Sequence, residues 1–198
     1  MIRLFDIVLS IIALLFFSPL WIAIAIITCL TNRGKIFYIQ ARRGRNGKYF
    51  RVAKFRTIEK GKIVSWFSHI LRKTALDEAP QMINILKGDM SFVGPRPLID
   101  KEIEEIKDKD LLAKRLMARP GLTGISQIFI PRTSSVEKKI SYDLLYIQNS
   151  QLNVYIKFIF LSFLITFLGR WEHTSSYKMI FLDRYIQKIK KKLQQENV

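Results

Sequence analysis

The feature that most constrains this chain is a run of 26 residues without a charged side chain, from Ile7 to Asn32. As one continuous helix, the run would be about 39 Å long at about 1.5 Å per residue, which exceeds the ~30 Å hydrocarbon core of a bilayer. It is too long for a signal peptide, and no clear small-residue cleavage site precedes the basic segment that follows. We therefore expect residues 1–33 to form a retained membrane anchor.

Ser18-Pro19 interrupts this run in its middle. Proline lacks a backbone donor and clashes with the preceding turn, so we expect the helix to bend near Ser18. One arrangement is a kinked helix that spans the bilayer, since proline is tolerated in membrane helices. The other is a re-entrant helix that turns back and leaves both ends on one side.

The chain is strongly basic, with 33 Lys+Arg against 16 Asp+Glu and a net charge of +17. Residues 33–73, directly after the anchor, carry +12 of that charge. The positive-inside tendency then places the body of the protein, residues 34–198, in the cytoplasm as one domain at the inner membrane. Because the excess charge follows the anchor, we expect it to face lipid headgroups and phosphate substrates rather than nucleic acid.

The cysteine and histidine content limits the available chemistry. Cys29 is the single cysteine, so an internal disulfide is excluded. His69 and His173 are far apart and cannot supply a multi-histidine metal site. Any metal would be held by carboxylate and phosphate oxygens, which suits Mg²⁺.

A β-hairpin is predicted in the basic stretch. Asn46-Gly47 lies between two β-prone runs, 36–39 and 49–52, and this pair favours a tight turn. Period-2 alternation places Lys54 and Arg56 on one strand face. The two cations would grip one phosphate together, or the strand would be a basic edge that faces anionic headgroups.

The remaining pattern is mostly helical, which gives an α+β fold with interfacial helices around a compact catalytic domain. Apolar spacing predicts helices over 63–73, 75–86, 98–117 and 136–148. The apolar segment 152–168 contains Lys157, and its uncharged part is too short to span a bilayer, so we expect a buried or interfacial helix. From Leu182 the tail reads as a basic amphipathic helix, either on the membrane surface or packed on the domain.

The densest polar cluster surrounds Asp77-Glu78. Thr74 with Asp77 resembles a capping box, which would place both acids in the first turn of a helix. Adjacent helix positions point about 100° apart, so one carboxylate can face a reacting phosphorus while the other holds a metal ion. Arg72 lies just upstream. The alternative is that both acids merely favour a helix start.

Two rigid loops follow, Gly88–Pro97 and Arg119–Gly124. Pro97 restrains Arg96 to an extended conformation, which suits bidentate recognition of phosphate. The alternative is a pair of structural turns with arginines in solvent. The sequence contains no Walker A loop and no nucleophile elbow, so a phosphoryl-transfer site would use Asp, Glu, Arg, Lys and Mg²⁺.

These residues together resemble the bacterial sugar transferase family, in its small monotopic polyprenyl-phosphate phosphoglycosyl transferase form. The resemblance runs from about Arg3 to Gly169. The motifs that carry it are Arg3-x-x-Asp6, Ser18-Pro19, Lys54-Phe55-Arg56-Thr57, Asp77-Glu78-x-Pro80-Gln81, Gly88 to Pro97, and Arg119 to Gly124.

The resemblance implies transfer of a sugar-1-phosphate from a UDP-sugar to a polyprenyl phosphate, with release of UMP, as the first membrane step of a bacterial glycoconjugate pathway. It implies that Asp77 is the nucleophile and that Glu78 is the Mg²⁺ ligand. Arg72 and Arg96 match phosphate-contacting arginines of the family, and Ser18-Pro19 matches its re-entrant break.

The segment from Ile125 to Arg132 departs from the family pattern, which often reads Trp-Ala-Gln-Val-x-Gly-Arg after the glycine. Gln127 is retained, and we expect it, with Arg119, to help bind substrate. The donor sugar and the oligomeric state, including a homo-oligomer, stay open. The competing hypothesis is a non-enzymatic, basic, membrane-anchored binder of anionic lipid or nucleic acid, which would bind in a salt-sensitive manner.

Overall fold

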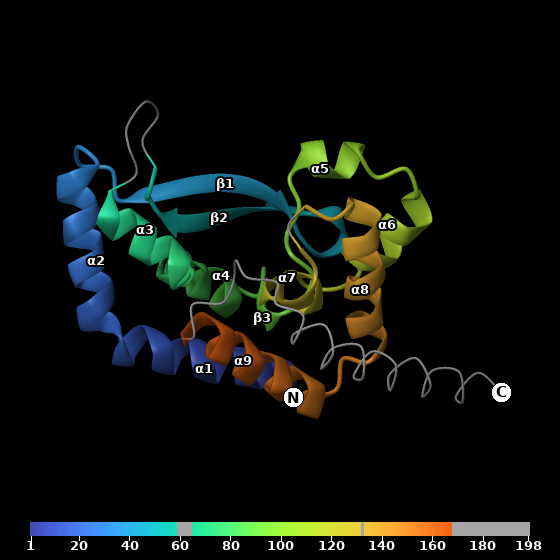
Figure 1. The fold of residues 1–198 in the computed structure, drawn as a ribbon. Coiled ribbons are helices and arrows are strands. Elements are labelled where there is room, and N and C mark those ends of the chain that lie inside the picture. The colour runs from blue at the N-terminus through green and yellow to red at the C-terminus, as the bar shows by residue number, and fades with distance from the viewer. Residues whose placement is uncertain (59–64, 132, 168–198) are drawn as a thin grey trace.

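The computed structural model describes residues 1–58, 65–131 and 133–167. Its elements, in chain order, are α1 (Ile2–Phe16), α2 (Ser18–Thr31), β1 (Phe37–Arg43), η1 (Arg45–Gly47), β2 (Tyr49–Phe55), α3 (Trp66–Lys73), η2 (Leu76–Gln81), α4 (Met82–Lys87), β3 (Ser91–Val93), α5 (Asp100–Glu104), α6 (Lys109–Leu116), β4 (Gly121–Thr123), α7 (Ile125–Phe129), α8 (Val136–Gln148) and α9 (Leu152–Phe167). The predicted mostly helical α+β fold is confirmed (Figure 1).

The predicted break in the N-terminal run is present. α1 and α2 meet at an angle of 66°. Pro19 has no N–H for the carbonyl of Leu15, and the Ser18 hydroxyl donates to that carbonyl at 2.8 Å instead. Within the described residues, no single helix has the length and apolarity to cross a membrane, whereas the bent pair passes that test jointly.

The start of α1 is fastened to the rest of the chain by Arg3. Its guanidinium donates to the backbone carbonyls of Ile85 and Leu86 at the end of α4, the second at 2.6 Å. These carbonyls belong to the last turn of a helix, where intrahelical donors run out. Arg3 therefore adds a donor to both, beside the Gly88 N–H that donates to the Ile85 carbonyl at 3.0 Å, and it orients α1 against α4.

Asp6 adds a buried polar contact one turn later. The carboxylate is fully buried, and its Oδ1 accepts from the Ser91 hydroxyl at 3.0 Å, from the Phe92 N–H at 3.0 Å and from the Tyr155 hydroxyl at 2.5 Å. One side chain thus joins α1, β3 and α9, and Figure 1 shows α1 and α9 side by side.

The far end of α2 is fastened to the hairpin. The Asn32 side-chain amide donates to the Arg56 carbonyl at 3.2 Å. A small core holds the same region together, because Ile24 of α2 packs with Phe55 of β2 and Leu71 of α3. Both ends of the bent pair therefore contact the same folded body.

The predicted hairpin is confirmed. β1 and β2 pair antiparallel from Phe37↔Phe55 to Arg43↔Tyr49. Asn46 (φ 56°) and Gly47 (φ 72°) both lie in the left-handed region, which is why this dipeptide suits the turn. The strands extend further than the β-prone runs indicated.

A second, parallel pair joins the two glycine-rich loops. β3 and β4 pair as Ser91↔Gly121 and Val93↔Thr123. A Cβ on Gly121 would lie 2.1 Å from the backbone nitrogen of Gly94, and one on Gly94 would lie 2.4 Å from the Arg119 carbonyl oxygen. The glycines are needed because the two loops touch backbone to backbone.

The predicted helix over 75–86 is wrong in its first half. Thr74 ends α3, and its hydroxyl donates to the Ile70 carbonyl at 2.8 Å instead of capping a new helix. Ala75 is left-handed (φ 56°), so the capping box with Asp77 does not form. The tighter η2 holds Asp77 and Glu78 and precedes α4.

The predicted helix over 98–117 is also divided, into α5 and α6. The Asp108 side chain accepts from the Leu111 N–H at 2.9 Å and so begins a new helix where a continuous one was expected.

Three further helix predictions agree with the structure. α3 lies within 63–73, whose start is outside the described residues, and α8 matches 136–148. α9 confirms the helix over 152–168 up to Phe167. The predicted tail helix from Leu182 lies outside the described residues.

Candidate functional site

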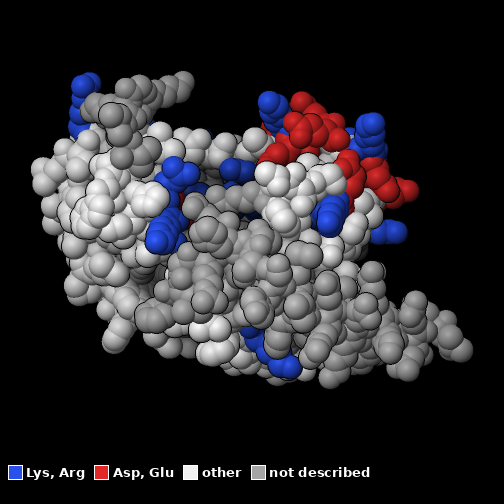
Figure 2. Space-filling view, in the orientation of Figure 1, with Lys and Arg blue, Asp and Glu red and all other residues white. Residues whose placement is uncertain are grey.

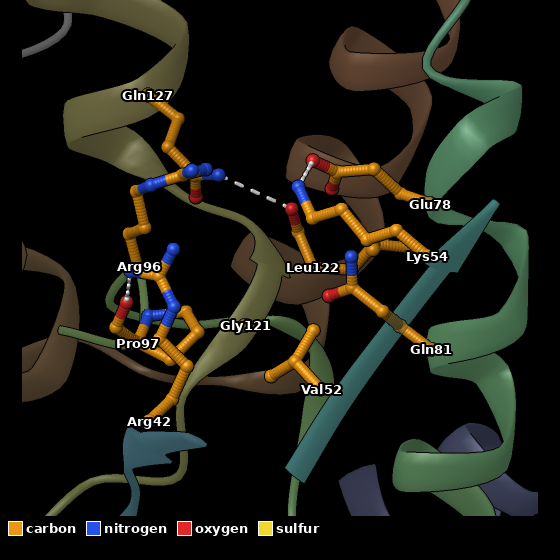
Figure 3. Close-up of a pocket in the computed structure, with 10 residues that line it drawn as sticks. All are labelled: Arg42, Val52, Lys54, Glu78, Gln81, Arg96, Pro97, Gly121, Leu122 and Gln127. Carbon is orange, nitrogen blue, oxygen red and sulfur yellow. Dashed lines mark hydrogen bonds and ion pairs between the residues drawn. The ribbon is translucent and has the colours of Figure 1, made fainter. Parts of the chain in front are cut away.

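A polar pocket lies where the hairpin, η2 and the two glycine loops converge. The pocket is open to solvent and is lined by Arg42, Val52, Lys54, Glu78, Gln81, Arg96, Pro97, Gly121, Leu122 and Gln127. Figure 3 shows side chains from these separate elements pointing toward one another across it. Three of the lining side chains are cations and one is an acid, so the pocket favours an anionic ligand.

The dyad of η2 forms one wall. Glu78 makes a short ion pair with Lys54, and both side chains are largely buried. Figure 3 shows this pair as a dashed line. Asp77 precedes Glu78 in η2 and is not among the residues that line the pocket. Burial, followed by the charge of Glu78, raises the pKa of the Asp77 carboxyl to about 6, and Lys54 partly opposes this.

Arg72 acts on the same carboxylate from the last turn of α3. Its positive charge opposes the rise in the pKa of Asp77, so the guanidinium lies within electrostatic reach of that group. The Arg72 side chain is exposed. Arg72 does not line the pocket, so the guanidinium beside the dyad stays a prediction.

Arg96 lies on the opposite wall, in the loop that follows β3, and its side chain is exposed. The Arg96 carbonyl accepts from Arg115 Nη2 at 2.7 Å. Arg115 in turn pairs with Asp143 at 2.9 Å, and both side chains are almost fully buried at 5% and 1% exposure. Ser126 donates to the other oxygen of Asp143 at 2.6 Å. This network fixes the backbone that presents Arg96.

Gln127 and Gln81 face the pocket with buried amide atoms that have no hydrogen-bond partner among the described residues. Gln127 Nε2 donates to the Leu122 carbonyl at 3.2 Å, which leaves Oε1 unpaired. For Gln81 the unpaired atom is Nε2. Buried polar atoms are costly when unpaired, so these two amides are suited to contact a bound polar molecule.

Two predicted substrate residues lie elsewhere. Arg56 is beyond the end of β2, where its Nη2 donates to the Phe37 carbonyl at 3.3 Å, and it does not line the pocket with Lys54. Arg119 precedes β4, is partly buried and also does not line it. The joint grip of Lys54 and Arg56 on one phosphate therefore does not form within this pocket.

The expected Mg²⁺ site can be judged from the donor atoms. Within the described ranges, no three His, Cys, Asp or Glu side chains form a metal cluster. Magnesium usually binds one or two carboxylates and completes its shell with water and substrate phosphates. Glu78 fits that requirement, because its carboxylate lines the cationic pocket beside Asp77.

Arg42 is a site residue that the sequence reasoning missed. In the hairpin register Arg42 pairs with Phe50 and Gln40 with Val52, so Arg42 shares a face with Val52 and Lys54. A two-residue turn at Asn46-Gly47 would instead have paired Arg42 with Arg51, on the face away from Lys54, so the longer turn of the structure had to be known first. The Arg115–Asp143 pair joins segments 28 residues apart and had no local signal.

Charge is unevenly distributed over the surface around the pocket. Figure 2 shows basic side chains near the hollow centre of this face and acidic ones gathered over α5 and the turn into α6. The acidic residues of that region are Asp100, Glu102, Glu104, Glu105, Asp108 and Asp110. An anion would therefore be drawn to the centre rather than to the rim.

Known proteins are similar to this chain over most of its length. The profile of the bacterial sugar transferase family matches residues 1–169. The exopolysaccharide production protein ExoY of Rhizobium meliloti (strain 1021) is 35% identical over 178 residues, or 76% of this chain and 78% of that protein.

Longer relatives match as well. The UDP-glucose:undecaprenyl-phosphate glucose-1-phosphate transferase of Klebsiella pneumoniae is 35% identical over 85% of this chain and 40% of its own length. The undecaprenyl-phosphate galactose phosphotransferase of Salmonella typhimurium is 33% identical over 74% of this chain and 36% of its own. This chain thus spans less than half of these two relatives.

Proposed function

Because the chain belongs to the bacterial sugar transferase family and is a phosphoglycosyl transferase, we propose that it transfers a sugar-1-phosphate from a UDP-sugar to a polyprenyl phosphate and releases UMP. The observation that carries this proposal is the pocket in which Glu78, the neighbour of Asp77 in the chain, lies among the cations Lys54, Arg96 and Arg42, while the charge of Lys54 also acts on Asp77. A nucleotide diphosphate matches both the charge and the polarity of that pocket.

In the first step, an Asp77 carboxylate oxygen attacks the phosphorus that bears the sugar. The new O–P bond forms as the bond from that phosphorus to the bridging oxygen breaks, and UMP leaves with the electron pair. The pKa of Asp77, about 6, leaves the carboxylate mostly ionised at neutral pH and more basic than an ordinary aspartate.

In the second step, an oxygen of the polyprenyl phosphate attacks the aspartyl phosphosugar. The bond between phosphorus and Asp77 breaks, which restores the carboxylate and forms a polyprenyl diphosphate sugar. A covalent intermediate suits a reaction between a water-soluble donor and a lipid acceptor, because the two substrates need not be bound at once.

The charged groups around Asp77 have separate tasks. Arg72 and Arg96 stabilise the negative charge that develops on the phosphoryl oxygens. Glu78 would hold Mg²⁺ together with the substrate phosphates, and the ion would supply further charge neutralisation at the leaving group. Lys54, already paired with Glu78, keeps the two acids from repelling each other fully.

The placement of the bent pair supports a re-entrant anchor over a spanning one. Arg3, near the start of α1, bonds to α4, whereas Asn32, just after α2, bonds to the end of β2. A helix that crossed the bilayer would separate these two ends by about 30 Å of hydrocarbon. Both ends instead contact one body, which we place on the cytoplasmic face of the inner membrane.

Exposed apolar side chains mark the surface that would enter the lipid. Leu15, Phe16 and Leu30 of the bent pair are 71–79% exposed, and Phe160 and Phe163 of α9 are 66% and 69% exposed. α9 lies beside α1 (Figure 1), so exposed apolar side chains occur on neighbouring helices. A peripheral, partly inserted enzyme requires such a surface.

The test is UMP release by the purified full chain in detergent or nanodiscs, with Mg²⁺, a panel of UDP-sugars and undecaprenyl phosphate. We expect release with at least one UDP-sugar and none from Asp77→Asn. Asp110→Asn, at an acidic surface position of α6, is the matched control and should retain wild-type turnover.

Intact-protein mass spectrometry then tests the covalent step. With the productive donor and no acceptor, the wild-type mass should rise by one sugar-phosphate group, whereas Asp77→Asn should not change. Full activity in Asp77→Asn would contradict the covalent mechanism. Salt-sensitive nucleic-acid binding without UMP release would favour the non-enzymatic alternative.

A further inference from the structure

Arg42 enters the pocket from β1, opposite the dyad. Its side chain is only 14% exposed. Nη1 donates to the Pro97 carbonyl at 3.1 Å, and Nη2 donates to Gln40 Oε1 at 2.7 Å. Figure 3 shows the Arg42 and Arg96 guanidiniums on the same side of the pocket. Arg42 is thus held in place before any ligand binds.

The charge of Arg42 is poorly compensated. Its nearest carboxylate is Glu102, at 3.5 Å, and that group is also engaged with the Ile99 N–H at 2.9 Å. Burial, followed by the charge of Arg96, lowers the pKa of Arg42, with only partial opposition from Glu102. Two guanidiniums in one pocket repel each other unless an anion lies between them.

We propose that Arg42 and Arg96 together bind the diphosphate of a nucleoside diphosphate, with Arg42 as a second guanidinium ligand that acts beside Arg96. This inference rests on the proposed function for the identity of the nucleotide. Planar guanidiniums match phosphate oxygens in a bidentate manner, and two of them converge where the pocket has excess positive charge.

The position of Arg42 favours the nucleotide over the lipid phosphate as its ligand. Arg42 is next to the turn end of the hairpin, near α5, whereas Asn32 at the end of the anchor bonds to the opposite hairpin end at Arg56. A water-soluble ligand reaches that end more readily than a phosphate fixed at the lipid surface.

A structural role is the competing explanation, because the bond from Arg42 to the Pro97 carbonyl also supports the loop that carries Arg96. The two roles differ in what they change. If Arg42 were only structural, its loss would lower stability and weaken the binding of every ligand alike. If Arg42 binds phosphate, its loss would weaken only the binding of molecules that carry the diphosphate.

The experiment titrates UDP, UMP and uridine into the full chain in nanodiscs by calorimetry, for the wild type, Arg42→Gln, Arg42→Lys and Arg51→Gln. Arg51→Gln removes the same charge from an exposed position on the other face of the hairpin. Thermal unfolding of each variant is recorded in parallel.

We expect Arg42→Gln to weaken UDP binding by about 10- to 100-fold, as for loss of a charge-assisted hydrogen bond, and to leave uridine binding unchanged. Arg42→Lys should recover part of the UDP affinity, and Arg51→Gln should bind UDP as the wild type does. Equal UDP affinity in Arg42→Gln and Arg51→Gln would overturn the proposal. So would an equal loss of affinity for UDP and uridine in Arg42→Gln.

The UDP titration also separates this inference from the proposed function. If the wild type binds UDP through Arg42 but releases UMP from no UDP-sugar, the proposed function fails and the phosphate site stands. If turnover is found but UDP affinity is indifferent to Arg42, the proposed function stands and the phosphate site fails.

Discussion

The buried pair of Arg115 and Asp143 offers a sharp test of how the loop that carries Arg96 is held. Asp143→Asn keeps the shape of the side chain but removes its charge. Arg115 would then be left at 5% exposure without a counter-ion. Removal of one partner from a buried pair typically costs about 3–5 kcal/mol, because the other charge stays uncompensated. Against a typical total stability of about 5–15 kcal/mol, that loss is large.

The double variant Arg115→Met with Asp143→Leu makes this test sharper. It removes both charges, so the large penalty of the single variant should disappear. The Ser126 hydroxyl and the Arg96 carbonyl still lose their partners, at 2.6 and 2.7 Å, at about 1–3 kcal/mol for each buried unpaired group. We therefore expect the double variant to lose about 2–6 kcal/mol, a range that overlaps the loss for Asp143→Asn, and to turn over more slowly because the Arg96 backbone is no longer held.

Urea unfolding in detergent micelles, followed by tryptophan fluorescence, gives the free energies, and UMP release gives turnover. Asp110→Asn, at a surface position of α6, is the control and should stay within about 0.5 kcal/mol of the wild type. A loss below about 1 kcal/mol for Asp143→Asn would refute the argument that this pair is essential to the loop. So would wild-type turnover in the double variant.

Four further outcomes are expected. The first-step rate should fall as pH decreases through about 6, because protonated Asp77 is not a nucleophile. Lys54→Met should move this fall in rate to higher pH, since the charge of Lys54 opposes the rise in the pKa of Asp77. A stopped-flow pH profile of the first step that is flat from 5 to 8 would contradict both expectations. Gly121→Ala should cost about 1–3 kcal/mol and lower turnover, because the new Cβ would lie 2.1 Å from Gly94 N; an unchanged melting temperature would show that the loops can separate. Asp6→Ala should cost more than about 2 kcal/mol by unfolding, since three donors lose one acceptor, while the protein still sediments with membranes. Chelation of divalent cations should stop UMP release and added Mg²⁺ should restore it; full activity in excess chelator would remove the metal from the proposal.

Local patterns predicted much of this fold. Asn46-Gly47 produced the hairpin and Ser18-Pro19 the bend, because each feature depends on the backbone preferences of one or two residues. The helix over 136–148 was also predictable from its apolar period and its Ser135 cap. The segment 75–86 was predicted wrongly, because the Thr74 hydroxyl bonds back into α3 and Ala75 takes a left-handed conformation.

The site itself could be predicted only in part. Asp77, Glu78, Arg96 and Gln127 were found because they belong to short recognisable motifs, and all but Asp77 line the pocket. Contacts between distant segments were not visible in the sequence. The pairing of β3 with β4 brings two glycine loops together, and the bond from Tyr155 to Asp6 closes a separation of 149 residues. Such contacts depend on the whole packed chain.

The hold of Asp6 on β3 and α9 has a practical consequence for protein engineering. A truncated chain that begins at residue 34, designed to yield a soluble enzyme, would lack the acceptor of Ser91, Phe92 and Tyr155 and would expose the apolar core around them. A better route to a water-soluble version keeps Arg3 and Asp6 and replaces the outward apolar side chains Leu15, Phe16, Ile22 and Leu30 with polar ones. The anchor would then be solubilised in place, as a structural member of the fold, rather than removed.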